Sequence, residues 1–181
     1  MMTTHRKEGV VEWIGLRSKP RADPTPVSHV TAVEGEGLGG DHFRNVGGNR
    51  QVTLIQHEHL RGVASILGIP TVDPGLTRRN IVVSGINLVG LKDARFRIGE
   101  AVLEFSGECH PCSRMEENLG PGGYNAMRGH GGIIARVVKG GVIRRGDRVV
   151  ALQVVTEQGV TDGAGAGVLA PDGSESAGAI E

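Results

Sequence analysis

The sequence predicts a mostly β fold, a closed or partly open β-barrel with one or two short helices, and three observations support this class. The 181 residues include 30 glycines, which separate many short β-rich segments. Aromatic residues make up 3% of the chain and hydrophobic residues 38%, so the core must consist mainly of Val, Ile and Leu, residues that favour strands. Only one segment has convincing helical spacing, and barrels need few helices.

The predicted strands recur between Gly-rich turns along most of the chain. Their apolar residues do not alternate strictly, as Val10-Val11-Glu12-Trp13-Ile14 shows, and this is typical of strands buried on both faces. The expected strands are Val10–Leu16, Val27–Val33, Gln51–Ile55, Asn80–Val83, Ala101–Ser106, Ile133–Val138 and Arg148–Val155.

The predicted main helix is His57–Leu67. Its apolar side chains recur at i, i+3, i+4 and i+7, and they are Leu60, Val63, Ala64 and Leu67. Gly68 follows and is expected to end the helix. A second, shorter helix is expected from Met115 to Leu119.

The length suits one domain, and we expect it to span residues 1–157. The remaining residues, 158–181, are rich in Gly, Ala and Ser and poor in large apolar side chains. Such a composition buries too little surface to offset the entropy of ordering, so a flexible tail is expected.

The charge balance bears on the partners. The 20 Lys and Arg residues match the 20 Asp and Glu residues, which argues against a broad basic surface for nucleic acid. An Arg cluster could still hold a small anion. No apolar segment approaches the ~18 residues of a membrane span, and the start of the chain has no signal-like segment. We therefore expect a cytoplasmic protein without a membrane partner.

A Gly-rich loop follows the second predicted strand. Gly35, Gly37 and Gly40 match the spacing of a dinucleotide-binding loop, but that loop must open a helix, and Gly47-Gly48 interrupts the segment that follows. The loop is better suited to a tight turn. At its end stand Asp41 and His42, the first a candidate turn residue or acid and the second a packed or functional histidine.

The two cysteines form the motif Cys109-His110-Pro111-Cys112, for which four interpretations remain open on the residues alone. A thioredoxin-type dithiol needs βαβ surroundings that this chain lacks. A zinc site lacks a second Cys-x-x-Cys or His-x-x-x-His, so no zinc is expected. A single thiolate could be favoured by nearby cations and bind a soft metal or sulfane sulfur. Both cysteines could also be small buried hydrophobes.

Several separated motifs, taken in order, resemble the MOSC domain, named for the C-terminal domain of molybdenum-cofactor sulfurases. The resemblance runs in family order from about residue 9 to residue 155, roughly four-fifths of the chain, so a chance match of loose motifs is a poor explanation. The matching segments are Gly39-Gly40-Asp41-His42, Arg50-Gln51-Val52-Thr53-Leu54, Arg79-Asn80-Ile81, Arg97-Ile98-Gly99, Pro111-Cys112, Arg128-Gly129 and Gly146-Asp147.

The resemblance implies a closed or nearly closed β-barrel of the small stand-alone bacterial type. It selects Cys112 as the family's hallmark cysteine and implies two uses for it. In one, Cys112 ligates molybdenum in a bound pyranopterin cofactor. In the other, Cys112 carries a persulfide received from a cysteine desulfurase.

With molybdenum bound, the resemblance implies an oxidoreductase that reduces N-hydroxylated compounds with electrons from an external donor. The small-molecule substrate would lose its oxygen at a site where Asp41 and His42 orient the cofactor or donate a proton. The expected cofactor-binding residues, chosen because guanidinium groups pair with phosphate oxygens and amides hydrogen-bond the pterin, are Arg50, Arg78, Arg79, Asn80 and Arg128.

Overall fold

A computed structural model of the chain describes residues 5–152. The predicted tail, residues 158–181, and the domain boundary at 157 lie outside this range. No helix within the described range is long and apolar enough to cross a membrane.

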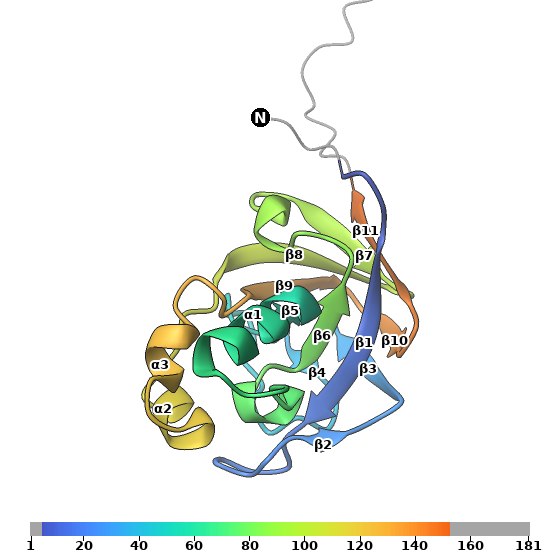
Figure 1. Ribbon diagram of the computed structural model, residues 1–181. Helices are drawn as coiled ribbons and strands as arrows, with labels where there is room; N and C mark the ends of the chain where they lie inside the picture. Colours follow the sequence, from blue (N-terminus) through green and yellow to red (C-terminus); the bar gives the residue numbers. More distant parts are fainter. Residues whose placement is uncertain (1–4, 153–181) are drawn as a thin grey trace, which may run out of the picture.

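Seven strands close into a barrel (Figure 1). In spatial order they are β1 (Gly9–Leu16), β6 (Ile81–Ser84), β5 (Val52–Gln56), β9 (Ile133–Lys139), β8 (Ala101–Glu108), β7 (Arg95–Ile98) and β11 (Arg148–Leu152). The pairing of β11 with β1, where Gly9 faces Val149, closes the circle. β5 and β6 run parallel because α1 connects them, whereas the other barrel pairs are antiparallel.

A small second sheet packs beside the barrel. It contains β10 (Gly141–Arg144), β3 (His29–Val33) and β4 (Gly37–Leu38), while β2 (Thr25–Pro26) pairs with the end of β1. Val30 and Ile143 of this sheet join the same hydrophobic core as the barrel strands. The sheet therefore adds to the barrel core and is not a separate unit.

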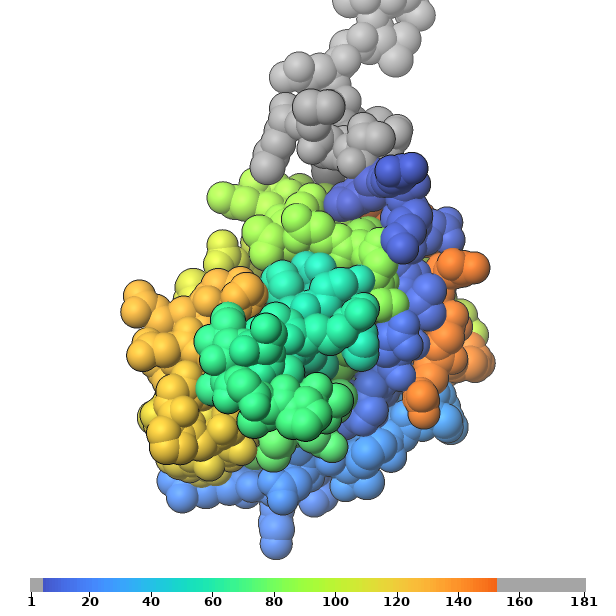
Figure 2. Space-filling view, in the orientation of Figure 1, coloured from blue at the N-terminus to red at the C-terminus, as the bar shows by residue number. Residues whose placement is uncertain are grey.

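The helices cover one face of the barrel. α1 (His57–Leu67) buries Leu60, Val63 and Ala64 against Ile55, and its C-terminal Gly68 has a φ of 67°, the left-handed conformation that suits glycine. Figure 2 shows α1 in the middle of this face with α2 (Arg114–Leu119) and α3 (Gly123–Ala126) beside it. Two short 3-10 helices, η1 (Pro74–Thr77) and η2 (Val89–Leu91), complete the elements.

The predicted barrel and main helix are confirmed, and each predicted strand has a counterpart within a few residues. The expected helix near Met115–Leu119 is present as α2. Four short strands were missed, β2, β4, β7 and β10, and the three α-helices exceed the one or two predicted. The turn at Gly35 leads into β4, which begins at Gly37, and no helix follows. This agrees with the rejection of a dinucleotide site.

Strand register brings distant segments to one end of the barrel. Ile14 pairs with Ile81, Ile81 with Leu54, Leu54 with Ile133, and Ile133 with Glu108. One step beyond this row, Thr53 lies beside Asn80, and the end of β1 with Arg17 lies at the same end of the barrel. The Cys109 sulfur approaches from the other side of the row, 3.8 Å from Arg50 Nη2. This end of the barrel therefore collects the side chains that the sequence places on separate motifs.

Candidate functional site

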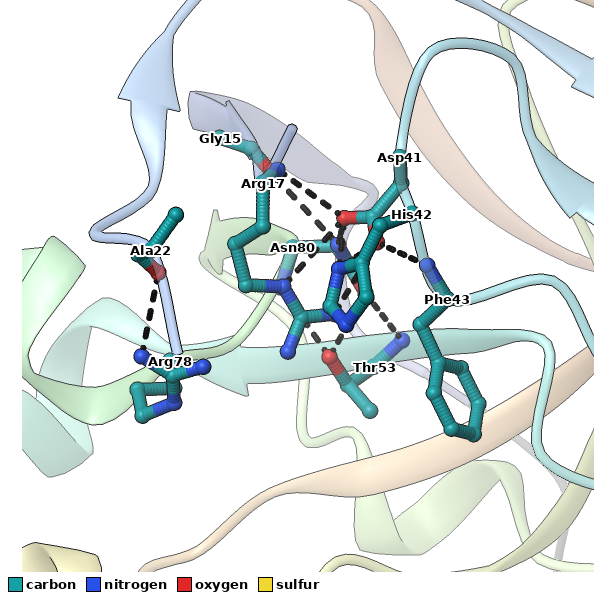
Figure 3. Close-up of polar contacts among 9 residues, drawn as sticks. All are labelled: Gly15, Arg17, Ala22, Asp41, His42, Phe43, Thr53, Arg78 and Asn80. Carbon is teal, nitrogen blue, oxygen red and sulfur yellow. Dashed lines mark hydrogen bonds and ion pairs between the residues drawn. The ribbon is translucent and has the colours of Figure 1, made fainter. Parts of the chain in front are cut away.

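Asp41 is the centre of a buried polar network at this end of the barrel (Figure 3). Its carboxylate is 2% exposed and pairs with the Arg17 guanidinium at 3.3 Å. It also accepts hydrogen bonds from Asn80 Nδ2 at 2.7 Å and from the backbone N–H of Phe43 at 2.8 Å. The bond to the N–H two residues on is the Asx turn expected of Asp41. Asp41 is also a fixed negative charge within the site.

Asn80 links the network to the strands. Its Oδ1 accepts hydrogen bonds from the Thr53 hydroxyl at 2.8 Å and from the Thr53 N–H at 3.2 Å. Its Nδ2 donates to Asp41 and to the Gly15 carbonyl oxygen. Since both ends of the amide are engaged, Asn80 positions Asp41, and direct contact with a cofactor stays a prediction.

His42 lies beside Asp41 with its side chain 20% exposed. Its Nδ1 is 3.4 Å from Asp41 Oδ1, close enough for an ion pair when the ring is protonated, although no hydrogen bond is formed in this geometry. Its backbone N–H donates to the Arg17 carbonyl oxygen at 2.7 Å. Asp41 and His42 are thus brought together as the sequence predicted.

A pocket of about 230 Å³ opens next to this network. Arg50 lies at its edge, with its guanidinium 6.0 Å from the centre of the Phe43 ring, within reach of a cation–π interaction. The lining residues are Arg17, Phe43, Arg50, Gln51, Thr53 and Asn80.

The two cysteines differ sharply in accessibility. Cys112 is exposed, whereas Cys109 is only 2% exposed. Arg50 Nη2 lies 3.8 Å from the Cys109 sulfur. Cys112, the hallmark cysteine of the resemblance, is therefore also the thiol that a ligand can reach.

Arg79 was expected to contact a phosphate, which requires an accessible guanidinium, but its environment is different. It is 4% exposed, and it donates to the carbonyl oxygens of Gly131 at 2.9 Å, Thr77 at 2.6 Å and Cys109 at 2.8 Å, with a longer bond to His110 at 3.4 Å. Burial lowers the pKa of the Arg79 guanidinium, and the negative form of Cys109 opposes this. Arg79 therefore ties the cysteine loop to the barrel in this structure.

A group of arginines lies near Cys112. Burial lowers the pKa of Arg78, and the positive charges of Arg17 and Arg114 lower it further, while Asp23 and Cys112 oppose the shift. These charges must be close together to act on one another. Arg78 donates one hydrogen bond, to the Ala22 carbonyl oxygen at 3.1 Å, and Arg114 lies 3.6 Å from Glu117. We call Arg17, Arg78 and Arg114 the arginine cluster.

Arg128, another expected phosphate ligand, is exposed in the turn after α3, and its role stays a prediction. Arg17 was missed by the sequence analysis because it belongs to no motif. Its position one residue past the end of β1 was the available signal, since strand ends meet at the rim of a barrel.

His59 and His130 form a pair behind the cysteine loop, with ring centres 5.1 Å apart. Within residues 5–152, neither Nδ1 atom has a hydrogen-bond partner. His59 is half-buried. Burial lowers the pKa of His59, the charge of His130 lowers it further, and Glu58 and the His130 backbone oppose the shift.

Acidification is expected to destabilise the protein through His59. The lowered pKa means that the unfolded chain binds a proton more readily than the folded chain, so stability is retained above the ordinary value of 6.5 and falls as the pH drops through it. Urea unfolding at about pH 7.5 and about pH 5.5 measures the effect. His59→Gln should lose less stability than wild type, whereas His29→Gln, at an exposed strand position, should match wild type. Equal losses in wild type and His59→Gln would contradict the assignment.

Comparison with known proteins agrees with this geometry. The profile of the MOSC domain matches residues 38–150. The chain belongs to the MOSC family. A search of curated proteins gave no significant match.

Solved structures share the fold of this MOSC domain. The YuaD protein from Bacillus subtilis has a TM-score of 0.70 and 20% identity, and the alignment covers 80% of this chain and 96% of that one. YiiM from Escherichia coli has a TM-score of 0.62 and 19% identity over 82% of this chain and 72% of that one. YiiM from Geobacillus stearothermophilus has a TM-score of 0.61 and 21% identity over 80% and 74%. MOSC domains are generally linked to molybdenum-cofactor binding or to sulfurase-like functions.

Proposed function

We propose that this MOSC domain binds a molybdenum cofactor through Cys112 and the arginine cluster and reduces N-hydroxylated compounds. The observation that supports the proposal is the juxtaposition of an exposed thiol with three guanidinium groups at one end of the barrel. A thiolate is a soft ligand that suits molybdenum, and the guanidinium groups suit a phosphate.

The donor set fits such a cofactor. Among residues 5–152, no three His, Cys, Asp or Glu side chains are grouped to hold a metal ion by themselves. Cys112 would thus be a single protein ligand, and the pterin dithiolene would provide further sulfurs. When bound, the metal would supply a two-electron centre for removal of an oxygen atom from nitrogen.

The arginine cluster is the better candidate for the cofactor's phosphate than Arg79. Arg79 is buried and its guanidinium already donates to backbone carbonyl oxygens. Arg78 and Arg17, by contrast, are only partly buried, and both are among the polar side chains drawn in Figure 3. Because Cys112 is among the groups close enough to act on the pKa of Arg78, a phosphate held by Arg78 would lie on the same side of the barrel as the thiol.

His42 is the group best placed to deliver a proton to the departing oxygen. Its ring is partly exposed, and its Nδ1 lies 3.4 Å from the Asp41 carboxylate. Arg17 and Asn80 hold Asp41 in place. His42 can therefore act as a general acid, with the Asp41 carboxylate beside it as a counter-charge.

The arginine cluster gives the first test. After expression in a host that makes the cofactor, Arg78→Gln should retain about tenfold less pterin and molybdenum than wild type, since a lost charged contact to phosphate costs on the order of 1.4 kcal/mol or more. Arg148→Gln, at an exposed position in β11, is the matched control. Wild type should oxidise a reduced viologen dye when an N-hydroxylated base analogue is added. Equal loading of Arg78→Gln and wild type, or no reduction by loaded protein, would contradict the proposal.

The exposure of Cys112 also favours the second candidate, a persulfide carrier. A desulfurase must bring its own sulfur to the acceptor thiol, so the acceptor has to be accessible. Incubation with a cysteine desulfurase and cysteine should then add about 32 Da to wild type and nothing to Cys112→Ser. A chain that gains this sulfur and never retains molybdenum is a carrier.

A further inference from the structure

Cys109 has an environment that an inert core cysteine does not need. Its sulfur is buried but lies 3.8 Å from Arg50 Nη2. Its carbonyl oxygen accepts a hydrogen bond from Arg79 Nη2 at 2.8 Å, which places a second guanidinium beside it.

This placement makes Cys109 reactive in principle. A thiol buried among apolar groups stays protonated, whereas neighbouring cations favour the thiolate, the form that attacks sulfur. Arg50 is exposed and Arg79 is fixed by backbone carbonyls, so one of the two charges sits permanently beside the cysteine loop. The Cys109 sulfur is thereby held close to two guanidinium groups without being accessible to solvent.

The chain between the two cysteines is a short loop without regular structure. Residues 109–112 form neither helix nor strand and connect β8 to α2. Cys109 is held by its N–H bond to the Gly132 carbonyl oxygen at 2.8 Å and by Arg79. The exposed Cys112 is the partner that has to turn inward.

We infer that Cys109 is the resolving thiol of a redox pair with Cys112. A peroxide first oxidises the exposed Cys112 thiolate to a sulfenic acid and leaves as hydroxide or alcohol. The Cys109 thiolate then attacks the Cys112 sulfur, the S–S bond forms, the S–O bond breaks and hydroxide leaves. The two sulfurs lose two electrons in total, and the peroxide gains them. A dithiol reductant reverses the reaction by thiol–disulfide exchange.

Disulfide formation would remove the Cys112 sulfur from any metal or persulfide and so switch the site off reversibly. This regulatory consequence rests on the proposed function, but the disulfide chemistry does not. Cys109 would also protect Cys112 from the irreversible steps of oxidation.

The test uses the full-length, metal-free protein, treated with hydrogen peroxide, denatured, alkylated with N-ethylmaleimide and weighed by mass spectrometry. Wild type should lose about 2 Da and take up no label, while Cys109→Ser should gain about 32 Da as a sulfinic acid on Cys112. Cys112→Ser should keep one thiol that takes the label. Sulfinic acid on Cys112 of wild type, with Cys109 still available for labelling, would overturn the inference.

A variant of the neighbouring charge distinguishes this pair from any two nearby cysteines. Arg50→Gln should form the disulfide about threefold more slowly, because it removes the guanidinium that lies 3.8 Å from the attacking sulfur. Arg50→Lys, which keeps the charge, should restore most of the rate. Arg44→Gln removes another exposed arginine of the same loop, one that pairs with Glu36, and should match wild type. An unchanged rate in Arg50→Gln would contradict the role of the guanidinium. Since no cofactor takes part, failure here is independent of failure to bind molybdenum.

Discussion

Replacing Arg79 with alanine is expected to lower the free energy of unfolding by about 3 to 5 kcal/mol. The substitution removes a buried guanidinium and leaves the carbonyl oxygens of Gly131, Thr77 and Cys109 without their donor. Each buried polar group left unpaired costs about 1 to 3 kcal/mol, and the losses do not add fully. The shift of the urea unfolding midpoint measures the effect.

Two further variants show whether the hydrogen bonds cause this loss. Arg61→Ala, at an exposed position of α1, should change stability by less than about 0.5 kcal/mol. Arg79→Lys keeps the charge but cannot reach the same set of carbonyls, so it should recover only part of the loss. If Arg79→Ala were as stable as Arg61→Ala, the claim that Arg79 ties the cysteine loop to the barrel would be refuted.

The second large effect is expected at Asp41. Asp41→Ala should cost about 3 to 5 kcal/mol, because it leaves the partly buried Arg17 guanidinium without its counter-charge and the Asn80 amide without its acceptor. The same variant should lower the rate of any reduction that needs a proton from His42, since His42 loses the carboxylate beside it.

A double-mutant cycle with Arg17→Met isolates the ion pair. The double variant Arg17→Met with Asp41→Ala should be more stable than the sum of the two single losses predicts, because the remaining charge of each single variant is then absent. Strict additivity in urea unfolding would show that the two side chains do not depend on each other.

Much of the fold could be predicted from sequence because its signals are local. The helix His57–Leu67 has a full apolar face and a glycine stop, and its bounds were predicted correctly. β7 was missed although Arg95-Phe96-Arg97-Ile98 alternates in burial, since four residues form a strand only when neighbours complete the ladder. β10 likewise depends on β3, far away in the sequence, where Val142 faces Thr31.

The sequence indicated which residues lie at the site better than it indicated what each of them does. Asp41, His42 and Asn80 were expected together because their motifs follow the family order, and they do lie together. The role of Arg79 was not visible, because a sequence does not show whether a guanidinium meets solvent or backbone carbonyls. The place of Arg17 in the site depends on strand register, which puts the end of β1 beside the start of β6.

The most direct test of the account is the molybdenum content of protein purified from a host that makes the cofactor. Wild type and Cys109→Ser should each carry up to about one molybdenum per chain, whereas Cys112→Ser, equally folded by circular dichroism, should carry about tenfold less. A wild-type protein without molybdenum, or a Cys112→Ser protein with as much metal as wild type, would contradict the central claim that the exposed sulfur at residue 112 holds the metal.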